Sequence, residues 1–389
     1  MSAAATDPYH GQEIKLTERT SPPFRADHVG SLLRPPEVKA ARESFAAGAI
    51  TAAELRAVED EAIRSAVAMQ EQVGLALATD GEIRRQSWHM DFIYQLGGIG
   101  RAPSEVQAVE FHTLDGDTIV SAQGSLRVND KVSLDHTIFG DDFSTLASMT
   151  TTAVPKQTIP SVNMIYARGG RAAIDEGAYP DLEQFWADIV AAYGEELRRL
   201  GALGCTYLQF DDTSLASIND PQLREKIAAR GDDADTLHLT FIRRLNDVIA
   251  HKPAGMAITT HMCRGNFRSS FSAAGSYDFV AEALFSELNV DGFFVEYDDE
   301  RSGGFEPLRF VPKGKMVVLG LVTTKRGELE TKDELKRRIE EASAFVPLEQ
   351  ICLSPQCGFA STMEGNDLSY EQQVEKLRLV VETAQEVWC

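Results

Sequence analysis

The 389-residue sequence predicts an α/β protein, most simply a closed (β/α)8 barrel. Eight short apolar runs have strand character, and they alternate with amphipathic stretches whose apolar residues recur at helical period. Strands that alternate with helices pair in parallel, and eight such units close into a barrel. A doubly wound open sheet is the alternative architecture.

Each predicted strand is a short apolar run that ends in polar residues. The eight strands are Phe24–Gly30, Ala76–Asp80, Ala153–Ile159, Thr206–Phe210, Ala257–His261, Gly292–Glu296, Met316–Leu321 and Ile351–Ser354. The helix-like segments between and after them include Ala52–Val73, Leu182–Leu203, Ala234–Ile249, Asp333–Phe345 and Tyr370–Val387. The segment 234–249, for example, carries a wide apolar face at helical period.

One stretch departs from this alternation. Between Val109 and Leu134, the pair Asp115-Gly116 stands between β-rich flanks, which is typical of a tight turn. We therefore expect a β-hairpin inserted after the second strand, in the region 105–134. Because no repeat or linker divides the chain, residues 21–389 are expected to form one barrel domain, preceded by a flexible lead over residues 1–20.

The composition is that of a soluble globular protein, with 43% apolar and 25% charged residues. A net charge of −21 argues against nucleic acid or an anionic membrane as a partner, because both require a basic surface. No apolar stretch is long enough for a membrane span, and the first 20 residues lack the apolar core of a secretion signal. Five scattered cysteines indicate a reducing cytoplasm rather than a disulfide framework.

Four residues at strand ends have the chemistry of zinc ligands. His261 and Cys263 end the fifth strand two residues apart, so their side chains point the same way, while Glu296 ends the sixth strand and Cys357 follows the eighth. Imidazole, thiolate and carboxylate are the protein ligands of Zn²⁺, and active sites of such barrels lie at the strand carboxyl ends. The alternative interpretation is a packed histidine, two inert buried thiols and a solvated glutamate.

Three further polar clusters follow predicted strands. Asp211 and Asp212 end the fourth strand, where they are either ammonium or proton acceptors or an ordinary helix cap. Glu82 follows Gly81, which permits a turn that aims the carboxylate over the barrel. Gly30-Ser31 offers a backbone N–H and a hydroxyl to a carboxylate, whereas the neighbouring His28 is a weaker candidate.

Two glycine-rich stretches lack the context of a ligand-binding loop. The run Gly97-Gly98-Ile99-Gly100 lacks the strand-turn-helix context of a nucleotide loop. The basic turn Arg168-Gly169-Gly170-Arg171 is interpreted as a flexible surface loop.

From Phe24 to the C-terminus the chain resembles the catalytic domain of cobalamin-independent methionine synthase, particularly its short, single-domain relatives. The motifs that carry the resemblance are Val29-Gly30-Ser31, Asp80-Gly81-Glu82, Gln209-Phe210-Asp211, His261-Met262-Cys263, Glu296 and Pro355-Gln356-Cys357-Gly358. The resemblance implies that His261, Cys263, Glu296 and Cys357 bind one Zn²⁺. It also implies that Glu82, Asp211 and Ser31 form a homocysteine pocket, and that Tyr166 takes the place of the ring that stacks on folate.

The expected reaction is zinc-dependent methyl transfer to the thiol of homocysteine, giving methionine, with methyltetrahydrofolate or another methyl donor. The zinc ion would turn the substrate thiol into a thiolate nucleophile, and Glu296 is the ligand expected to yield to it. Glu82 and Asp211 would hold the ammonium group, while His28 or Asp212 would pass a proton to the leaving group. The partners are then a small-molecule thiol and a methyl donor, and homo-oligomer formation stays open.

Other functions remain open on sequence alone. The same zinc scaffold also suits alkyl transfer to a different thiol such as coenzyme M, with epoxide opening, or a methyl group taken from a corrinoid protein. A sulfonate thiol would find cationic partners in Arg34, Arg84 and Arg264. A zinc-stabilised barrel without catalytic activity and a zinc-free decarboxylase of the uroporphyrinogen type are the remaining alternatives.

Overall fold

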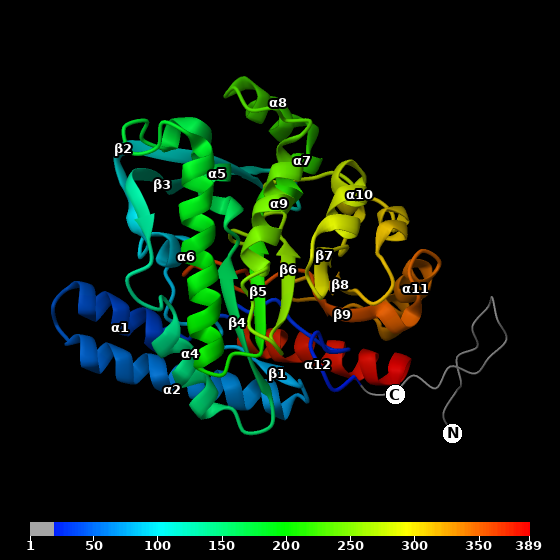
Figure 1. The fold of residues 1–389 in the computed structure, drawn as a ribbon. Coiled ribbons are helices and arrows are strands. Elements are labelled where there is room, and N and C mark those ends of the chain that lie inside the picture. Colours follow the sequence, from blue (N-terminus) through cyan, green and yellow to red (C-terminus); the bar gives the residue numbers. More distant parts are fainter. Residues whose placement is uncertain (1–18) are drawn as a thin grey trace.

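A computed structural model describes residues 19–389, with the side chains of 103–108 and 122–124 left undescribed, so nearly all of the expected lead over residues 1–20 lies outside the described part. Its centre is a seven-stranded parallel sheet in the order β1-β4-β5-β6-β7-β8-β9 (Figure 1). The strands are β1 (Leu77–Ala78), β4 (Val154–Pro160), β5 (Tyr207–Asp212), β6 (Ala257–Met262), β7 (Gly292–Glu296), β8 (Met316–Val322) and β9 (Ile351–Pro355).

Helices lie between successive strands and cover the outside of the sheet (Figure 1). The α-helices are α1 (Pro36–Ala46), α2 (Ala52–Gln72), α3 (Met90–Ile93), α4 (Gly140–Met149), α5 (Asn163–Gly169), α6 (Leu182–Ala202), α7 (Ser214–Asn219), α8 (Pro221–Ala229), α9 (Leu237–Ile249), α10 (Asp278–Glu287), α11 (Lys332–Ser343) and α12 (Tyr370–Trp388). Short 3₁₀ helices span Gly170–Ala173, Glu300–Ser302, Glu306–Phe310 and Leu348–Gln350. No helix within residues 19–389 has the length and apolar character needed to cross a membrane.

The predicted α/β barrel class is confirmed, and every adjacent pair in the seven-stranded sheet is parallel. Strands β5, β7, β8 and β9 are buried along their whole length, as expected for a parallel sheet that is covered on both faces. The main apolar core lies between these strands and the surrounding helices.

The prediction of a regular first strand over Phe24–Gly30 is wrong, because this segment makes a single bridge, between Ala26 and Leu353 of β9. The Asp27 side chain accepts from the backbone N–H groups of Phe24 and His28, at 3.1 and 2.8 Å, and thereby takes donors that a ladder would use. The segment nevertheless lies between the two sheet edges. Asp27 N–H donates to Leu353 O, and the hydroxyl of Thr79, just after β1, donates to Gly30 O at 2.6 Å.

An antiparallel pair, β2 (Gly97–His112) and β3 (Thr118–Ser133), follows β1 in the chain. It occupies the expected place but begins earlier than the predicted region 105–134. Its register shifts between Arg101 and Val106. At its tip, His112 bridges Phe271, with two backbone hydrogen bonds, so this ribbon reaches the loop that follows β6 (Figure 1).

Candidate active site

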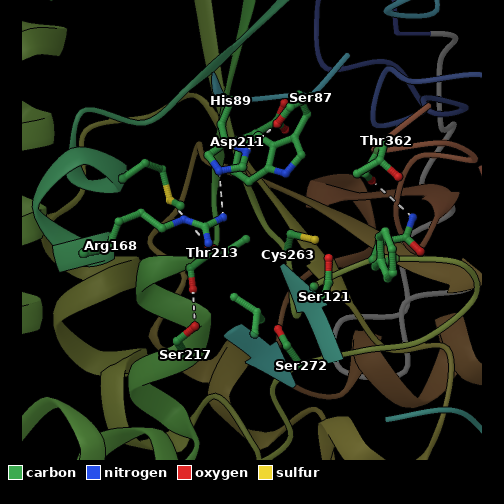
Figure 2. A pocket seen from close by; sticks show the side chains of 18 of the residues that line it. Ser87, His89, Ser121, Arg168, Asp211, Thr213, Ser217, Cys263, Ser272 and Thr362 are labelled. Atoms are coloured by element: carbon green, nitrogen blue, oxygen red, sulfur yellow. Dashed lines mark hydrogen bonds between the residues drawn. The ribbon is translucent and has the colours of Figure 1, made fainter. Parts of the chain in front are cut away.

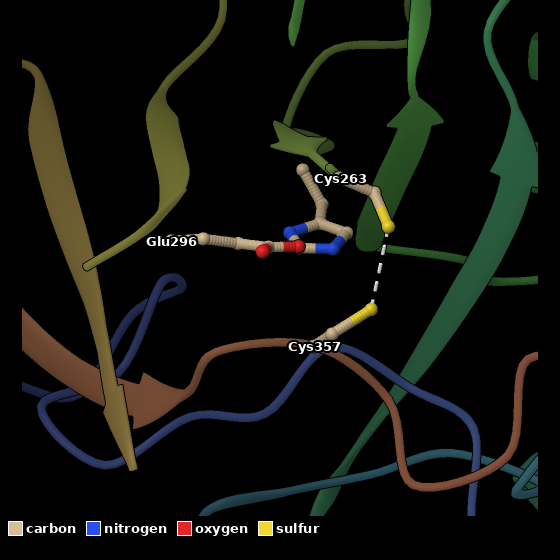
Figure 3. A group of neighbouring side chains, drawn as sticks. Cys263, Glu296 and Cys357 are labelled. Atoms are coloured by element: carbon tan, nitrogen blue, oxygen red, sulfur yellow. Dashed lines mark hydrogen bonds between the residues drawn. The ribbon is translucent and has the colours of Figure 1, made fainter. Parts of the chain in front are cut away.

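The four predicted metal ligands come together at the carboxyl end of the sheet (Figure 3). His261 lies in β6 and Cys263 directly after it, Glu296 is the last residue of β7, and Cys357 follows β9. One ligand atom from each residue lies within 4.8 Å of the others, and the two Sγ atoms of Cys263 and Cys357 are 3.4 Å apart. Residues separated by almost one hundred positions are thus gathered by the parallel order of three strands.

The chemistry of these groups fits a bound metal ion. Neither ring nitrogen of the buried His261 has a hydrogen-bond partner among the described residues. Oε2 of Glu296, also buried, accepts no hydrogen bond among them and lies 3.7 Å from Nη2 of Arg301. The other Glu296 oxygen accepts from the backbone N–H of Arg264 at 3.1 Å. Buried polar atoms without partners are costly, and a cation held by nitrogen, sulfur and oxygen would satisfy them. The alternative of a solvated Glu296 is wrong, because this side chain has no exposure.

The electrostatics of the cluster favour a thiolate at Cys357. Its pKa lies well below the ordinary value because the Cys263 thiol donates to it, an effect that burial opposes and the nearby His261 reinforces. The pKa of Cys263 is raised well above its ordinary value, first by this donation and then by burial. Burial, followed by the charge of Cys357, raises the pKa of Glu296 to about 6.

A cavity of about 1030 Å³ borders the cluster. Figure 2 shows part of its lining, including Cys263 and Asp211. Its wall includes three of the four metal-ligand candidates, together with the three residues expected to bind the amino-acid thiol. These six residues are His261, Cys263, Cys357, Ser31, Glu82 and Asp211. Residues at or just after the ends of β1, β5, β6 and β9, together with Ser31, therefore line a single concave site, as in other parallel barrels.

Glu82 is held in an unusual backbone conformation that points its carboxylate into this cavity. Its φ of 54° lies in the left-handed region, directly after Gly81 at φ 66°. Its Oε1 accepts from the Thr158 hydroxyl at 2.8 Å and lies 3.4 Å from the guanidinium of Arg85. Its Oε2 is buried and has no partner among the described residues. One oxygen is therefore fixed by the protein while the other is left for a ligand.

Asp211 is the second carboxylate of the thiol subsite. Its Oδ1 accepts from Gln209 Nε2 at 2.7 Å. Burial, followed by the charge of Glu82, raises the pKa of Asp211 to about 7. Two buried carboxylates that repel each other gain from a cation placed between them, so this pair suits an ammonium group.

Ser31 lies against the turn that carries Cys357, a contact that Gly358 permits, and Gly30 permits a separate close approach to Thr158. A Cβ at Gly358 would lie 1.9 Å from Ser31 Oγ, and a Cβ at Gly30, which has φ +148°, would lie 2.7 Å from Thr158 Cγ2. Neither approach is open to a residue with a side chain. The Gly30-Ser31 turn and the Cys357 turn are therefore packed directly on each other at the cavity floor.

A family model described as "Cobalamin-independent synthase, Catalytic domain" matches residues 24–386. The chain belongs to this family. The uncharacterized protein YxjH of Bacillus subtilis (strain 168) is 47% identical over 96% of this chain and 97% of its own length. The structure of a putative vitamin-B12-independent methionine synthase from Listeria monocytogenes superposes with a TM-score of 0.75, at 38% identity, over 95% of this chain and 99% of that chain.

A more distant relative is the 5-methyltetrahydropteroyltriglutamate–homocysteine methyltransferase of Lactococcus lactis subsp. cremoris (strain SK11). It is 23% identical over 92% of this chain, which corresponds to 42% of its own length. This chain of the cobalamin-independent synthase family therefore matches YxjH over nearly the whole length of both proteins, whereas it matches only part of the longer Lactococcus enzyme.

The two residues expected to transfer protons are hydrogen-bonded to other side chains in this member of the cobalamin-independent synthase family. Neither His28 nor Asp212 lines the cavity. The His28 ring is hydrogen-bonded to Gln70 at 2.8 Å, and burial, assisted by the charge of Lys156, lowers its pKa to about 3. The Asp212 carboxylate accepts from Asn163 and from Ser214 at the start of α7, which is the helix-cap alternative.

Tyr166 also lies away from the cavity wall. Its ring packs on Trp186 and Phe241, and its hydroxyl donates to Asp232 at 2.6 Å. It lies in α5, whose buried face could not be assigned from so short a segment. Among the aromatic residues that do line the cavity is Trp88, which follows Glu82 by six positions and was not singled out in the sequence.

Lys325 was also missed, although it is the third residue after β8, and polar residues close to strand ends were the ones selected elsewhere. Its side chain is buried, and its Nζ donates to Ser270 O at 3.3 Å and lies 3.5 Å from Asn266 Oδ1. Its charge contributes to lowering the pKa of Cys357, after Cys263 and His261. Lys325 therefore adds a positive charge close enough to Cys357 to favour its thiolate form.

The three arginines considered for a sulfonate are engaged elsewhere and do not line the cavity. Arg34 donates to backbone oxygens of Leu32 and Ala360. Arg84 pairs with Asp60 and Asp142. Arg264 donates to Gly275 O and stacks on a tyrosine ring. The thiol end of the cavity is thus lined by carboxylates rather than by these cations.

Proposed function

We propose that this protein transfers a methyl group to the thiol of homocysteine and forms methionine, with a zinc ion held by His261, Cys263, Glu296 and Cys357. The observation that carries the proposal is the position of this buried His-Cys-Glu-Cys group next to the Glu82 and Asp211 carboxylates in one cavity. The group supplies a thiol-activating metal site, and the carboxylate pair supplies recognition of an amino acid. Membership of the cobalamin-independent synthase family supports the same reaction.

The residues of the chain have separate tasks in this proposal. Glu82 and Asp211 bind the ammonium group of homocysteine through charge-assisted hydrogen bonds, and Ser31 offers its hydroxyl to the carboxylate. When bound, zinc lowers the pKa of a thiol so that it reacts as a thiolate. The cavity walls hold the sulfur and the methyl carbon at attack distance and exclude water.

The carboxylate pair also supports one class of acceptor thiol over another. A sulfonate thiol such as coenzyme M has no ammonium group, and it would bring a further negative charge next to Glu82 and Asp211. Arg34, Arg84 and Arg264, the three arginines that the sequence offered for a sulfonate, are bound to other groups. The proposed acceptor is therefore homocysteine, and methyltetrahydrofolate is the donor to test first.

The test is formation of methionine, followed by mass spectrometry, in zinc-loaded protein given homocysteine and methyltetrahydrofolate carrying a labelled methyl group. Labelled methionine is expected with the wild type and not with Cys263→Ser. Calorimetric titration with homocysteine alone tests the acceptor site without any donor. The proposal is refuted if the zinc-loaded protein binds no homocysteine.

A further inference from the structure

The basic turn that the sequence suggested to be a surface loop instead contributes to the cavity wall. Arg168 lies near the end of α5 and lines the cavity, together with His89 and Ser87 (Figure 2). None of these residues has a task in the thiol half of the site. They belong to a second region of the same cavity, on the side of the β1–α3 loop.

The side chains of Ser87, His89 and Arg168 are hydrogen-bonded in that order, with His89 in the middle. Ser87 Oγ lies 3.1 Å from His89 Nδ1, and Arg168 Nη2 lies 2.7 Å from His89 Nε2. Because a guanidinium only donates, His89 Nε2 must accept, and its Nδ1 then carries the proton and donates to Ser87. Burial, and then the charge of Arg168, hold the pKa of His89 well below its usual range, so the ring stays neutral. A neutral histidine thus fixes the position of a cation.

A second observation in the same region points to an oxygen-bearing ligand. The hydroxyl of Tyr94 is buried, has no partner among the described residues, and belongs to a side chain that lines the cavity. The guanidinium of Arg101 lies over its ring at 4.9 Å. Tyr94 and Arg168 are close enough to affect each other electrostatically. A hydroxyl donor and a fixed guanidinium together suit an oxyanion.

The surroundings favour an anion attached to a flat group. The indole of Trp88 packs against the His89 ring, with centroids 4.3 Å apart, and lines the cavity beside Met90. A cavity of about 1030 Å³ has room for more than one amino-acid thiol. The polar groups of homocysteine are already matched by Glu82, Asp211 and Ser31, so this second region is left for the other substrate.

We infer that Arg168, positioned by His89 and assisted by Tyr94, binds a carboxylate of the methyl donor, whose flat part lies against Trp88. The assignment of this carboxylate to the donor rests on the proposed function. The binding of an aromatic carboxylate at Arg168 does not rest on it. The two claims are therefore tested separately.

The first test uses benzoate as an aromatic carboxylate and benzamide as its uncharged counterpart. Each is titrated by calorimetry into zinc-loaded wild type, Arg168→Gln and the control Arg171→Gln. Arg171 lies on the same turn, but its guanidinium donates to Tyr179 O at 2.7 Å and does not line the cavity. Loss of a charged hydrogen bond is expected to weaken benzoate binding about ten-fold or more in Arg168→Gln only. Benzamide should bind all three proteins equally.

His89→Phe tests the positioning role, because it keeps a ring against Trp88 but removes the acceptor. It should weaken benzoate binding while leaving zinc content and near-ultraviolet circular dichroism unchanged. Equal benzoate affinity in the wild type, Arg168→Gln and His89→Phe would overturn the inference, even if methionine is formed.

The second test assigns the carboxylate to the donor. With a working donor, Arg168→Gln should raise KM for the donor about ten-fold and leave KM for homocysteine unchanged. A rise in KM for homocysteine instead overturns the assignment to the donor. If no methyl transfer occurs at all, the proposed function fails, whereas the benzoate titrations still decide whether the anion site exists.

Discussion

Replacement of Glu82 by glutamine tests the thiol subsite at a single atom. Glu82 Oε1 is bonded to Thr158 and lies near Arg85, whereas Oε2 lies in the buried cavity wall without a partner. Glutamine has the same size and can keep the bond to Thr158. It then presents an amide N–H₂ where the ammonium group of homocysteine would donate, and two donors cannot pair.

The size of the effect follows from the loss of one charge-assisted hydrogen bond, which contributes about 1.5–3 kcal/mol. This corresponds to a loss of homocysteine affinity of about ten-fold to about one hundred-fold. The ligand 4-mercaptobutyrate, which is homocysteine without its amino group, should bind Glu82→Gln at least as well as the wild type. Zinc content should be unchanged, because Glu82 is not a metal-ligand candidate.

Calorimetric titration of both thiols into zinc-loaded protein is the assay. Glu110→Gln is the matched control, because Glu110 also lines the cavity but pairs with Lys226. The reasoning is refuted if Glu82→Gln weakens both thiols equally, or if homocysteine binds the variant as tightly as the wild type.

Two further predictions concern stability. Lys156 and Asp27 form a fully buried ion pair at 2.9 Å. Lys156→Met should therefore lower the free energy of unfolding, measured by denaturant titration, by about 3–5 kcal/mol, because it leaves the Asp27 charge buried without its partner. Adding Asp27→Asn should recover part of this loss. Burial raises the pKa of Glu196 from 4.5 to about 7. The contribution of this group to the free energy of unfolding is therefore fully present below pH 4.5, and up to about 3 kcal/mol of it is lost as the pH rises through 7. Glu196→Gln should therefore gain stability relative to the wild type between pH 5 and pH 8, and a constant difference between the two proteins would contradict this.

The sequence was sufficient to predict which residues at strand ends come together in space. The residues of the metal-ligand group belong to types that favour the same ion, and the carboxyl ends of parallel strands necessarily meet. Glu82 was located in the same way, because Gly81 ended the second strand in a turn. These predictions required no knowledge of which face of a helix is buried.

The errors arose where a side chain had two equivalent interpretations. Asp211 and Asp212 are adjacent, and since side chains of a strand alternate, only one of them faces the cavity. Asp212 instead caps α7 through Ser214. The role of Asp27 as an acceptor for backbone donors, which interrupts the first strand, depends on contacts that a local pattern does not contain.

The most direct test of the account is the zinc content of the purified, reduced protein, measured by elemental analysis. Cys352 lies in β9, five positions before Cys357, and is buried outside the metal-ligand group, so Cys352→Ser is the control for Cys357→Ser. About one zinc ion per chain is predicted for the wild type and for Cys352→Ser, and almost none for a folded Cys357→Ser. No zinc in the wild type, or full zinc in Cys357→Ser, would contradict the central claim that this group is a metal site.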